Sequence, residues 1–346
     1  MIIPTERSMM RDTTLDAPAA TRQDPMNALA RLFCVLLALV APSCALAQPW
    51  PAKPIRLIVG FAPGGVADVT ARVVAQRLSE RLGAQVVVDN RPSAGGIVAA
   101  DAVAKAPPDG YTMLLLSNGN AVSASLFKAL PYDTLADFTP VSLLGTFDVA
   151  VVASAEAKID SMPALMAYAK ANPGKLNIGT INIGSTQHLS AEMFRAMAGF
   201  DATVVPFKGS PAVITALRAN DVQVAFEMLA PVMPQAKSGA VKILAVTSER
   251  RHPALPDVPT VAESGVPGYA ASSWNAIALP AKTPAPIVAR LHDEIERVLA
   301  LPDVRERLAA AGVTPRASTP EELARLLAAD VAKWRRVIEQ AKIERQ

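Results

Sequence analysis

IRLIVGFAPGGVADVTARVVAQRL, residues 55–78, begins as an apolar strand and ends as an amphipathic helix. The turn between the two elements contains Pro63, Gly64 and Gly65. Glycines let a ligand approach the backbone closely, and the turn lies at the positive end of the helix that follows. The stretch therefore predicts a strand–turn–helix unit whose turn can seat an anion. The alternative interpretation is a tight connection in which glycine only provides the turn geometry.

Strand-like segments alternate with helical patterns along most of the chain, which is typical of an α/β fold with largely parallel sheets. The predicted strands are 55–60, 85–89, 111–116, 148–153, 176–179, 203–206, 222–226, 242–247 and 273–279. The predicted helices are 66–82, 95–105, 162–171, 186–198, 210–218, 229–237, 284–300, 302–311 and 320–342.

The last three predicted helices follow one another without a strand, which indicates that strand 273–279 and these helices rejoin the first lobe. We therefore expect lobe 1 to comprise 48–149 and 272–346, with lobe 2 inserted as 150–271. Two crossing strands would then form a hinge, with a cleft between the lobes.

Residues 1–47 are interpreted as an N-terminal extension and a signal peptide, with Met26 as the true start. Arg31, an apolar core and Ala45-Leu46-Ala47 have the pattern of a secretory signal. The apolar run 32–41 is about half of the ~20 residues that a membrane span needs. We therefore expect cleavage near Ala47 and a periplasmic mature protein.

Composition and motifs exclude several classes of protein. The formal net charge is only +3, and Lys and Arg are scattered, so no nucleic-acid partner is expected. Cys34 and Cys44 both lie in the segment to be removed, which leaves no disulfide or thiolate. A lipid anchor on Cys44 is disfavoured, because "VAPSC" has alanine where such a site usually has leucine. The chain contains no zinc-protease, phosphate-loop, dinucleotide or nucleophile-elbow motif, so we expect no cofactor, no metal and no catalytic residue.

A second turn of the first kind occurs in the predicted lobe 2. Gly184, Ser185 and Thr186 follow a strand and open a helix. Three more polar or glycine-rich turns come directly after strands, at 90–96, 115–120 and 205–212. Ligands of open α/β sheets bind at the carboxyl ends of strands, so we expect all five turns to face one cleft between the lobes.

Nine segments, in order, resemble signature blocks of the Bug family, the extracytoplasmic solute receptors of tripartite tricarboxylate transporters. They are "PIRLIVGFAPGGVAD", "VVVDNRPSAGG", "AVAKAPPDGYTMLL", "LPYDTLADFTPVSLL", "ANPGKLNIGT", "GSTQHLSAEMF", "VPFKGSPA", "ILAVTSERRHPALPDVPTVAESGVPGY" and "SSWNAIALPAKTPAPIVARL". The resemblance covers essentially the whole mature chain. It implies a two-lobed periplasmic-binding-protein (Venus flytrap) fold, each lobe a mixed, mostly parallel sheet flanked by helices. It implies no enzymatic activity.

The resemblance also implies a set of residues that line the ligand site. They are Pro63, Gly64, Gly65, Asp68, Ser117, Asn118, Gly184, Ser185, Thr186, His188, Lys208, Gly209, Ser210, Glu227 and Trp274. Backbone groups and waters would hold the ligand carboxylate at the turns of both lobes. Three members have an alternative structural role: Asp68 as a helix cap, His188 as a structural residue and Trp274 in core packing.

The chain also departs from the family pattern. Val66 and Ala67 stand where the family usually has two hydroxyl residues, Ile97 replaces an asparagine, and Phe226-Glu227-Met228 replaces F-D-N. Fewer polar groups around the backbone seat put dicarboxylate and amino-acid ligands in doubt. We expect a monocarboxylate with an apolar or aromatic body.

The expected function is capture of a small carboxylate in the interlobe cleft, by a monomer, and its delivery to the permease subunits of a tripartite tricarboxylate transporter. One alternative is an exported isomerase or lyase that uses Asp68 and His188 in the same cleft. Others are a ligand sensor that feeds a signalling partner and a structural envelope protein. An enzyme would convert a ligand that a binding protein leaves unchanged.

Overall fold

The computed structural model describes residues 50–346. The predicted signal peptide lies outside the described residues. Lobe 1 is built on three parallel strands in the order β2-β1-β3: β1 (Ile55–Val59), β2 (Val86–Asn90) and β3 (Thr112–Ser117). β9 (Ser272–Pro280) extends this sheet antiparallel to β3, and β4 (Phe138–Ser154) pairs with β9. The short β10 (Thr314–Pro315) pairs with β4.

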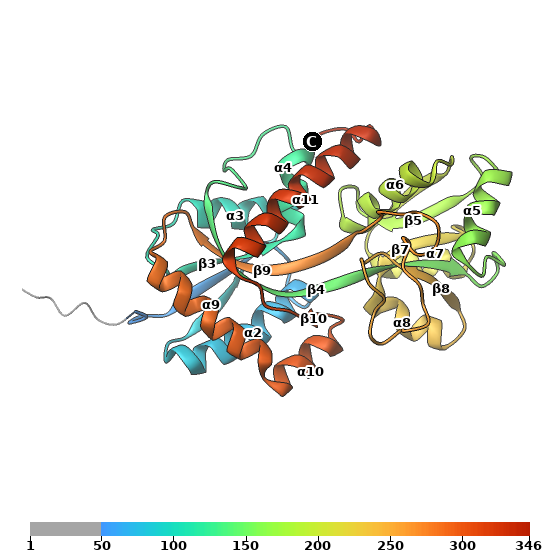
Figure 1. Ribbon diagram of the computed structural model, residues 1–346. Coiled ribbons are helices and arrows are strands. Elements are labelled where there is room, and N and C mark those ends of the chain that lie inside the picture. The colour runs from blue at the N-terminus through green and yellow to red at the C-terminus, as the bar shows by residue number, and fades with distance from the viewer. Residues whose placement is uncertain (1–49) are drawn as a thin grey trace, which may run out of the picture. The chain divides into compact units, whose positions relative to one another are not determined.

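Helices cover both faces of the lobe 1 sheet (Figure 1). One face carries α3 (Ile97–Ala104), α4 (Asn118–Leu126) and α11 (Pro320–Gln340), with the short 3₁₀ turn η1 (Ala94–Gly96) before α3. The opposite face carries α2 (Val66–Leu82), α9 (Ala285–Ala300) and α10 (Pro302–Ala310). Alternate strand residues enter the two cores: Leu57 packs toward α2, and Ile58 toward α3 and α4. The central strands β3 and β9 are thus buried on both sides, whereas Val87 of the edge strand β2 is exposed.

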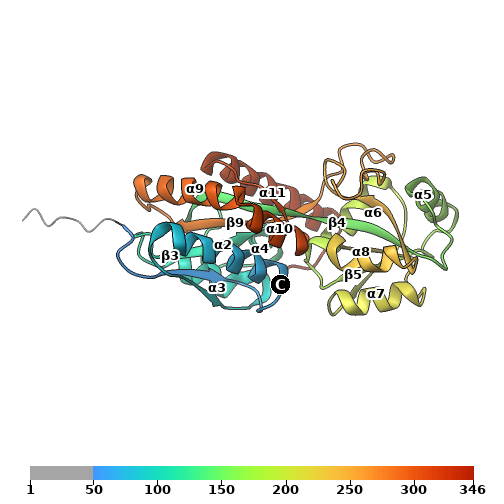
Figure 2. The same ribbon diagram turned by 90° about the horizontal axis from the view of Figure 1, so that it is seen from below.

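Lobe 2 repeats this layered arrangement around the parallel order β7-β5-β6. Its strands are β5 (Asn177–Ile181), β6 (Thr203–Phe207), β7 (Val224–Met228) and β8 (Val241–Val246). α5 (Met162–Ala171) and α6 (Thr186–Ala198) lie on one face, and α7 (Ser210–Arg218) and α8 (Leu229–Lys237) on the other (Figure 2). No helix within 50–346 is both long enough and apolar enough to span a membrane.

Two segments connect the lobes. β4 pairs antiparallel with β9 up to Asp148, opposite Ser272, and with β7 from Val149 onward. On the return path the N–H of Ala271 still donates to Thr247 of lobe 2, directly before β9 begins. The chain therefore passes between the sheets in adjacent extended segments, as expected for a hinge.

The predicted elements agree with the structure in lobe 2; in lobe 1 the short β10 and η1 were not predicted, and two larger differences occur. The helix α4 was not predicted, because "NGNAVSASL" contains residues of modest helix propensity. Its start is stabilised by Asn120, whose Oδ1 accepts a hydrogen bond from the Ser117 N–H at 2.9 Å. The strand prediction 148–153 covers only the end of the 17-residue β4. Pro140 and Gly145 in its first half argue against a strand by sequence, and the sheet accommodates Pro140 at a register shift.

Candidate functional site

The turn after β1 is organised by the carboxylate of Asp68. Gly64, at a φ of 86°, donates its N–H to Asp68 Oδ2 at 2.9 Å. Arg72 Nε donates to the same carboxylate at 3.0 Å, and Asn90 Nδ2 donates to Oδ1 at 2.8 Å. The Asp68 side chain is buried and has three protein donors, so it anchors the turn, whereas Gly65 is the N-cap of α2 and no side chain caps this helix.

The charge of Asp68 is stabilised in this position. Burial raises the pKa of the carboxyl, but the hydrogen bonds from Arg72, Gly64 and Asn90 outweigh it and hold the pKa below its usual value. The ionised carboxylate therefore orders the turn at neutral pH. Gly65 follows with an extended backbone and leads into α2, whose first N–H groups have no intrahelical partner. N–H groups of this kind can donate to an anion.

Asn118 opens α4 at the end of β3 and is fully buried. Its Oδ1 accepts a hydrogen bond from the indole N–H of Trp334 on α11 at 2.7 Å. Its Nδ2 donates to the Thr186 hydroxyl at 2.8 Å. Because Thr186 is the first residue of α6, Asn118 ties the lobe 1 turn to the corresponding turn of lobe 2.

The turn after β5 is closed by its own side chains. The Ser185 hydroxyl caps α6 by accepting the His188 N–H at 3.1 Å, and Gly184 donates its N–H to His188 Nδ1 at 3.4 Å. Burial lowers the pKa of His188, although Glu192 acts in the opposite sense, so the imidazole is neutral with Nδ1 as an acceptor. Gly184 has a φ of 79°, and a Cβ there would lie 2.3 Å from Leu126 Cδ2 of lobe 1. Glycine is required here both for the backbone conformation and for the close approach of the lobes.

Glu227 is the penultimate residue of β7 and is completely buried. Its Oε1 accepts hydrogen bonds from Gln187 Nε2 at 3.1 Å and from the Met228 N–H at 2.7 Å, whereas Oε2 has no hydrogen-bond partner among residues 50–346. Burial raises the pKa of Glu227, against the opposing effect of the hydrogen bonds from Gln187 and Met228 and of the nearby Ser210 hydroxyl. Ser210 begins α7 after Gly209, and the preceding Lys208 is exposed.

Trp274 lies in the core between β9 and α11. Its side chain is 1% exposed, and the indole N–H donates to Asp330 Oδ2 at 2.7 Å. This is the core-packing alternative, and Trp274 does not form a cleft wall here.

The other predicted residues occupy equivalent places in the two lobes. Pro63–Gly65 and Ser117–Asn118 follow β1 and β3; Gly184–Thr186, Gly209–Ser210 and Glu227 follow or end β5, β6 and β7. All of them lie at carboxyl ends of strands, and the Asn118–Thr186 hydrogen bond brings one turn of each lobe together.

Sequence reasoning missed two buried polar residues at these positions. Gln187, which binds Glu227, stands beside His188 in the quoted "GSTQHLS", so the motif itself contained the signal. Asn275 on β9 is 1% exposed and pairs with Ser117 across the sheet, and within the described part of the chain its Oδ1 and Nδ2 have no hydrogen-bond partner. A single asparagine within a strand pattern does not indicate that its side chain is buried without a hydrogen-bond partner.

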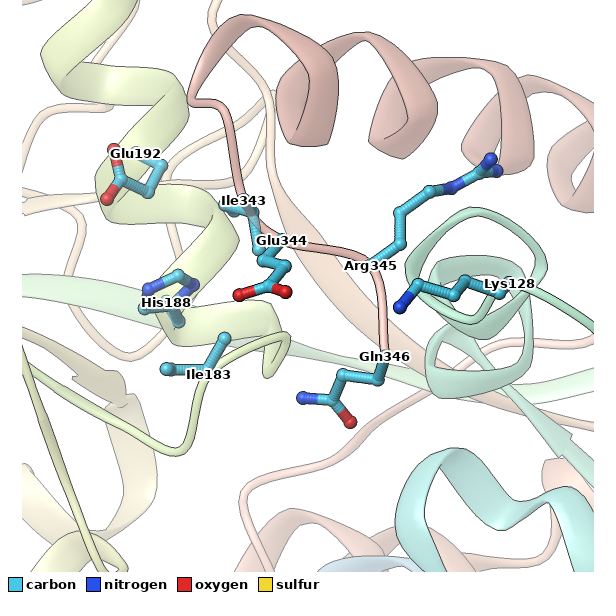
Figure 3. A pocket seen from close by; sticks show the side chains of 8 residues that line it. All are labelled: Lys128, Ile183, His188, Glu192, Ile343, Glu344, Arg345 and Gln346. Carbon is cyan, nitrogen blue, oxygen red and sulfur yellow. The ribbon is translucent and has the colours of Figure 1, made fainter.

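A cavity of about 500 Å³ lies where α6, the end of α4 and the chain after α11 meet. In Figure 3, His188, Glu192 and Ile183 form one wall, and Lys128 and Arg345 lie opposite them. The remaining lining residues are Ile343, Glu344 and Gln346. Only His188 belongs both to this cavity and to the predicted binding set.

Two α/β lobes joined by crossing strands, with helix N-termini at the facing strand ends, define the class of two-lobed solute-binding proteins. Residues 70–343 match the family model described as "Tripartite tricarboxylate transporter family receptor" (TctC), and the chain belongs to this family. The predicted Bug-type receptor is thereby confirmed, and the chain is a receptor and not an enzyme.

Relatives support the same assignment. Protein BugT of Bordetella pertussis is 38% identical over 309 residues, covering 89% of this chain and 94% of that protein. An R. palustris protein solved with adipate is 35% identical, covers 85% of this chain and 99% of that one, and superposes with a TM-score of 0.73. MatC from Rhodopseudomonas palustris, with bound malate, is 31% identical at a TM-score of 0.70 and covers 84% of this chain and all of that one.

Proposed function

We propose that this chain is a periplasmic solute-binding protein that captures a small carboxylate between its lobes and delivers it to a tripartite tricarboxylate-type transporter. The observation that carries the proposal is the position of four helix N-termini, those of α2, α4, α6 and α7, at carboxyl ends of strands in both lobes. Helix N-termini favour anions because their N–H groups are unpaired and carry the positive end of the helix dipole. The adipate and malate bound to the two R. palustris relatives support a carboxylate ligand.

Within the proposed site, the residues have two kinds of role. The N–H groups at Gly65 and Ser210 seat the carboxylate, because each lies at the start of a helix. Asp68 and His188 hold the turns in shape through the hydrogen bonds that they accept from Gly64 and Gly184. They are positioning residues.

The ligand we propose is a monocarboxylate with an apolar or aromatic body. Val66, Ile97 and Met228, which replace polar family residues, are half-buried and lie at the start of α2, the start of α3 and the end of β7. Their apolar side chains offer no hydrogen-bond partner to a second polar group on the ligand. A buried polar group without a partner costs about 1–3 kcal/mol. Ala67 is buried in the core under α2, so of the two replaced hydroxyls only the one at Val66 bears on the ligand.

We propose lobe boundaries of 48–149 with 272–346, and 150–271. The change of pairing partner in β4 after Asp148 and the hydrogen bond of Ala271 to Thr247 support both boundaries. A two-lobed receptor of this kind functions as a monomer in which closure of the hinge traps the ligand.

Export is proposed to remove residues 1–47, so that the mature chain begins at Gln48. Mass analysis of the N-terminus of exported protein tests this. A start at Cys44 with added lipid mass would contradict it.

Isothermal calorimetry on the mature protein tests the ligand class with hexanoate, adipate, malate and citrate. We expect hexanoate to bind more tightly than malate or citrate, and Val66→Ser to narrow the difference. Mass spectrometry of the recovered ligand should find it unchanged after hours with the protein. Tight citrate binding would contradict a monocarboxylate ligand. If none of the four acids binds, the proposed carboxylate-binding function is wrong. Conversion of the ligand would support the enzyme alternative.

A further inference from the structure

We propose that residues 343–346, here called the strap, carry a latch that holds the two lobes together over a bound ligand. In the closed form, Ile343 packs against Ile183 of lobe 2, and the Glu344 carboxylate accepts a hydrogen bond from His188. The inference rests on the proposed carboxylate-binding function. It adds residues outside the ligand turns that change the affinity for every ligand by the same factor.

The strap is fixed to lobe 1. The Gln346 N–H donates to Leu126 O at 2.9 Å, and Gln346 O accepts the Lys128 N–H at 2.8 Å. Arg345 Nε donates to Ser125 O at 2.9 Å. These contacts all lead to the end of α4, and within residues 50–346 the strap makes no hydrogen bond to lobe 2. The strap therefore moves with lobe 1.

The cavity of about 500 Å³ separates the strap from lobe 2 (Figure 3). Ile183 and His188 lie on its lobe 2 wall, and the strap lies on its lobe 1 wall. At Gly184, the residue after Ile183, the lobes already touch, since an added Cβ would lie 2.3 Å from Leu126 Cδ2. Packed atoms cannot approach further, so closure can narrow the seam only where space remains, as it does in this cavity.

The apolar part of the latch is Ile183 with Ile343. Ile183 is 51% exposed, although it is a large apolar side chain beside the other lobe. Ile343 is half-buried against the core and lines the same cavity. Contact between them removes the exposed apolar surface of Ile183 from water, which favours the closed form.

The polar part of the latch is His188 with Glu344. His188 is 5% exposed, and its Nδ1 accepts the Gly184 N–H at 3.4 Å, which places the ring proton on Nε2. Nε2 has no hydrogen-bond partner within residues 50–346, so His188 offers an unpaired donor to the cavity. Glu344 is exposed, and in Figure 3 its carboxylate projects from the strap into the cavity on the side of His188. A hydrogen bond to a carboxylate would satisfy this donor.

The latch contacts form between the lobes and not with the ligand. They therefore stabilise the closed form by the same free energy whichever ligand is bound. The apparent dissociation constant depends on the fraction of the protein that adopts the binding-competent form. Loss of a latch contact should weaken all ligands by one factor and leave the preference among them unchanged, whereas loss of a ligand contact changes the preference.

Calorimetry on the mature protein with hexanoate and adipate tests this signature. Glu344→Ala and Ile183→Ser should each weaken both acids by the same factor, about three- to tenfold. Both side chains are exposed, so the melting temperature without ligand should not change. Glu339→Ala on α11 and Met197→Ser on α6 replace an exposed carboxylate and an exposed apolar side chain that do not line the cavity. These matched controls should bind like the wild type.

A cross-link reports the contact directly. The two cysteines of the sequence, Cys34 and Cys44, lie in the segment proposed to be removed, so Ile183→Cys with Ile343→Cys creates a single pair. A disulfide requires Cα atoms within about 7 Å of each other. With copper–phenanthroline as the oxidant, hexanoate should speed disulfide formation about threefold or more. It should have no effect when Gly65→Val is also present.

The cross-link also covers the case that Glu344→Ala or Ile183→Ser is destabilised. Wild-type affinity in both of these variants, unequal factors for the two acids, or a cross-linking rate that hexanoate does not raise would each overturn the latch alone. A wild type that binds none of hexanoate, adipate, malate and citrate would overturn the proposed function and the latch with it.

Discussion

The Asn118 side-chain amide donates a hydrogen bond of 2.8 Å to the Thr186 hydroxyl and so joins the first turn of α4 to the first turn of α6 across the two lobes. The other atom of the same amide accepts the Trp334 indole N–H at 2.7 Å. Both contacts are buried, where hydrogen bonds are least exchanged with water. One side chain therefore sets the position of a lobe 1 turn relative to α11 and to lobe 2.

Replacing Asn118 should destabilise the protein more than replacing its partner in lobe 2. Asn118→Leu leaves both the Trp334 N–H and the Thr186 hydroxyl unpaired, and each buried group costs about 1–3 kcal/mol. Thr186→Val loses only the contact between lobes, and Thr186→Ser keeps it as a control. Thermal unfolding should give melting temperatures in the order wild type, Thr186→Ser, Thr186→Val, Asn118→Leu. Equal values for Asn118→Leu and the wild type would contradict the role of this amide.

The contribution of Asp68 to stability should depend on pH. Its folded pKa lies below the unfolded value, so the ionised carboxylate stabilises the native state at neutral pH, and this stabilisation is lost as the pH falls through the folded pKa. Asp68→Asn should lower the free energy of unfolding by about 1–3 kcal/mol at neutral pH. In denaturant titrations the difference from the wild type should vanish in acid. Asp160→Asn, at an exposed carboxylate, should show no such trend.

Gly65→Val should abolish carboxylate binding without changing the stability of the fold. Gly65 has a φ of −79°, and the nearest atom to an added Cβ is Ala62 O at 3.8 Å, so the fold tolerates the change. The branched side chain would cover the N–H groups at the start of α2. We expect a wild-type melting temperature with loss of binding to every carboxylate in calorimetry. Normal hexanoate binding by this variant would show that the carboxylate sits elsewhere.

Gly184 and Leu126 should be energetically coupled. Gly184→Ala places a Cβ 2.3 Å from Leu126 Cδ2 and forces alanine to a φ of 79°, whereas Leu126→Ala removes the obstructing atom but leaves the strain. The double mutant should therefore lose less stability than the sum of the single mutants, by about 0.5–3 kcal/mol in a double-mutant cycle. If the stability losses of the two single mutants simply add in the double mutant, Gly184 and Leu126 are not in contact across the lobes.

Ligand should bring the lobes closer by bending β4 and the segment before β9. Solution scattering of the mature protein should then show a smaller radius of gyration with saturating hexanoate than without ligand. Gly65→Val, which cannot bind, is the control and should keep the larger value. An unchanged curve for the wild type at saturation would count against hinge closure.

Local signals made most of lobe 2 predictable. Helices 162–171, 186–198, 210–218 and 229–237 were predicted with the bounds that the structure has, because each begins at a turn or cap and has an apolar face. Lobe 1 was less predictable where tertiary contacts override propensity. α4 depends on its packing against α11, and the first half of β4 is a strand because β9 pairs with it despite Pro140.

By itself, the sequence determined the order of strands and helices apart from η1, α4 and β10, and the glycine turns that follow β1 and β5, since periodicity and turn chemistry depend on neighbouring residues. Only the tertiary structure decided what the polar side chains at those turns bind. Asn90 lies 22 residues from Asp68, Gln187 lies 40 from Glu227, and Thr186 lies 68 from Asn118. Burial and hydrogen bonding between such distant residues exist only once the sheets have formed, and these contacts make Asp68 a turn anchor, Asn118 a bridge between lobes and Glu227 a buried acid with one free oxygen.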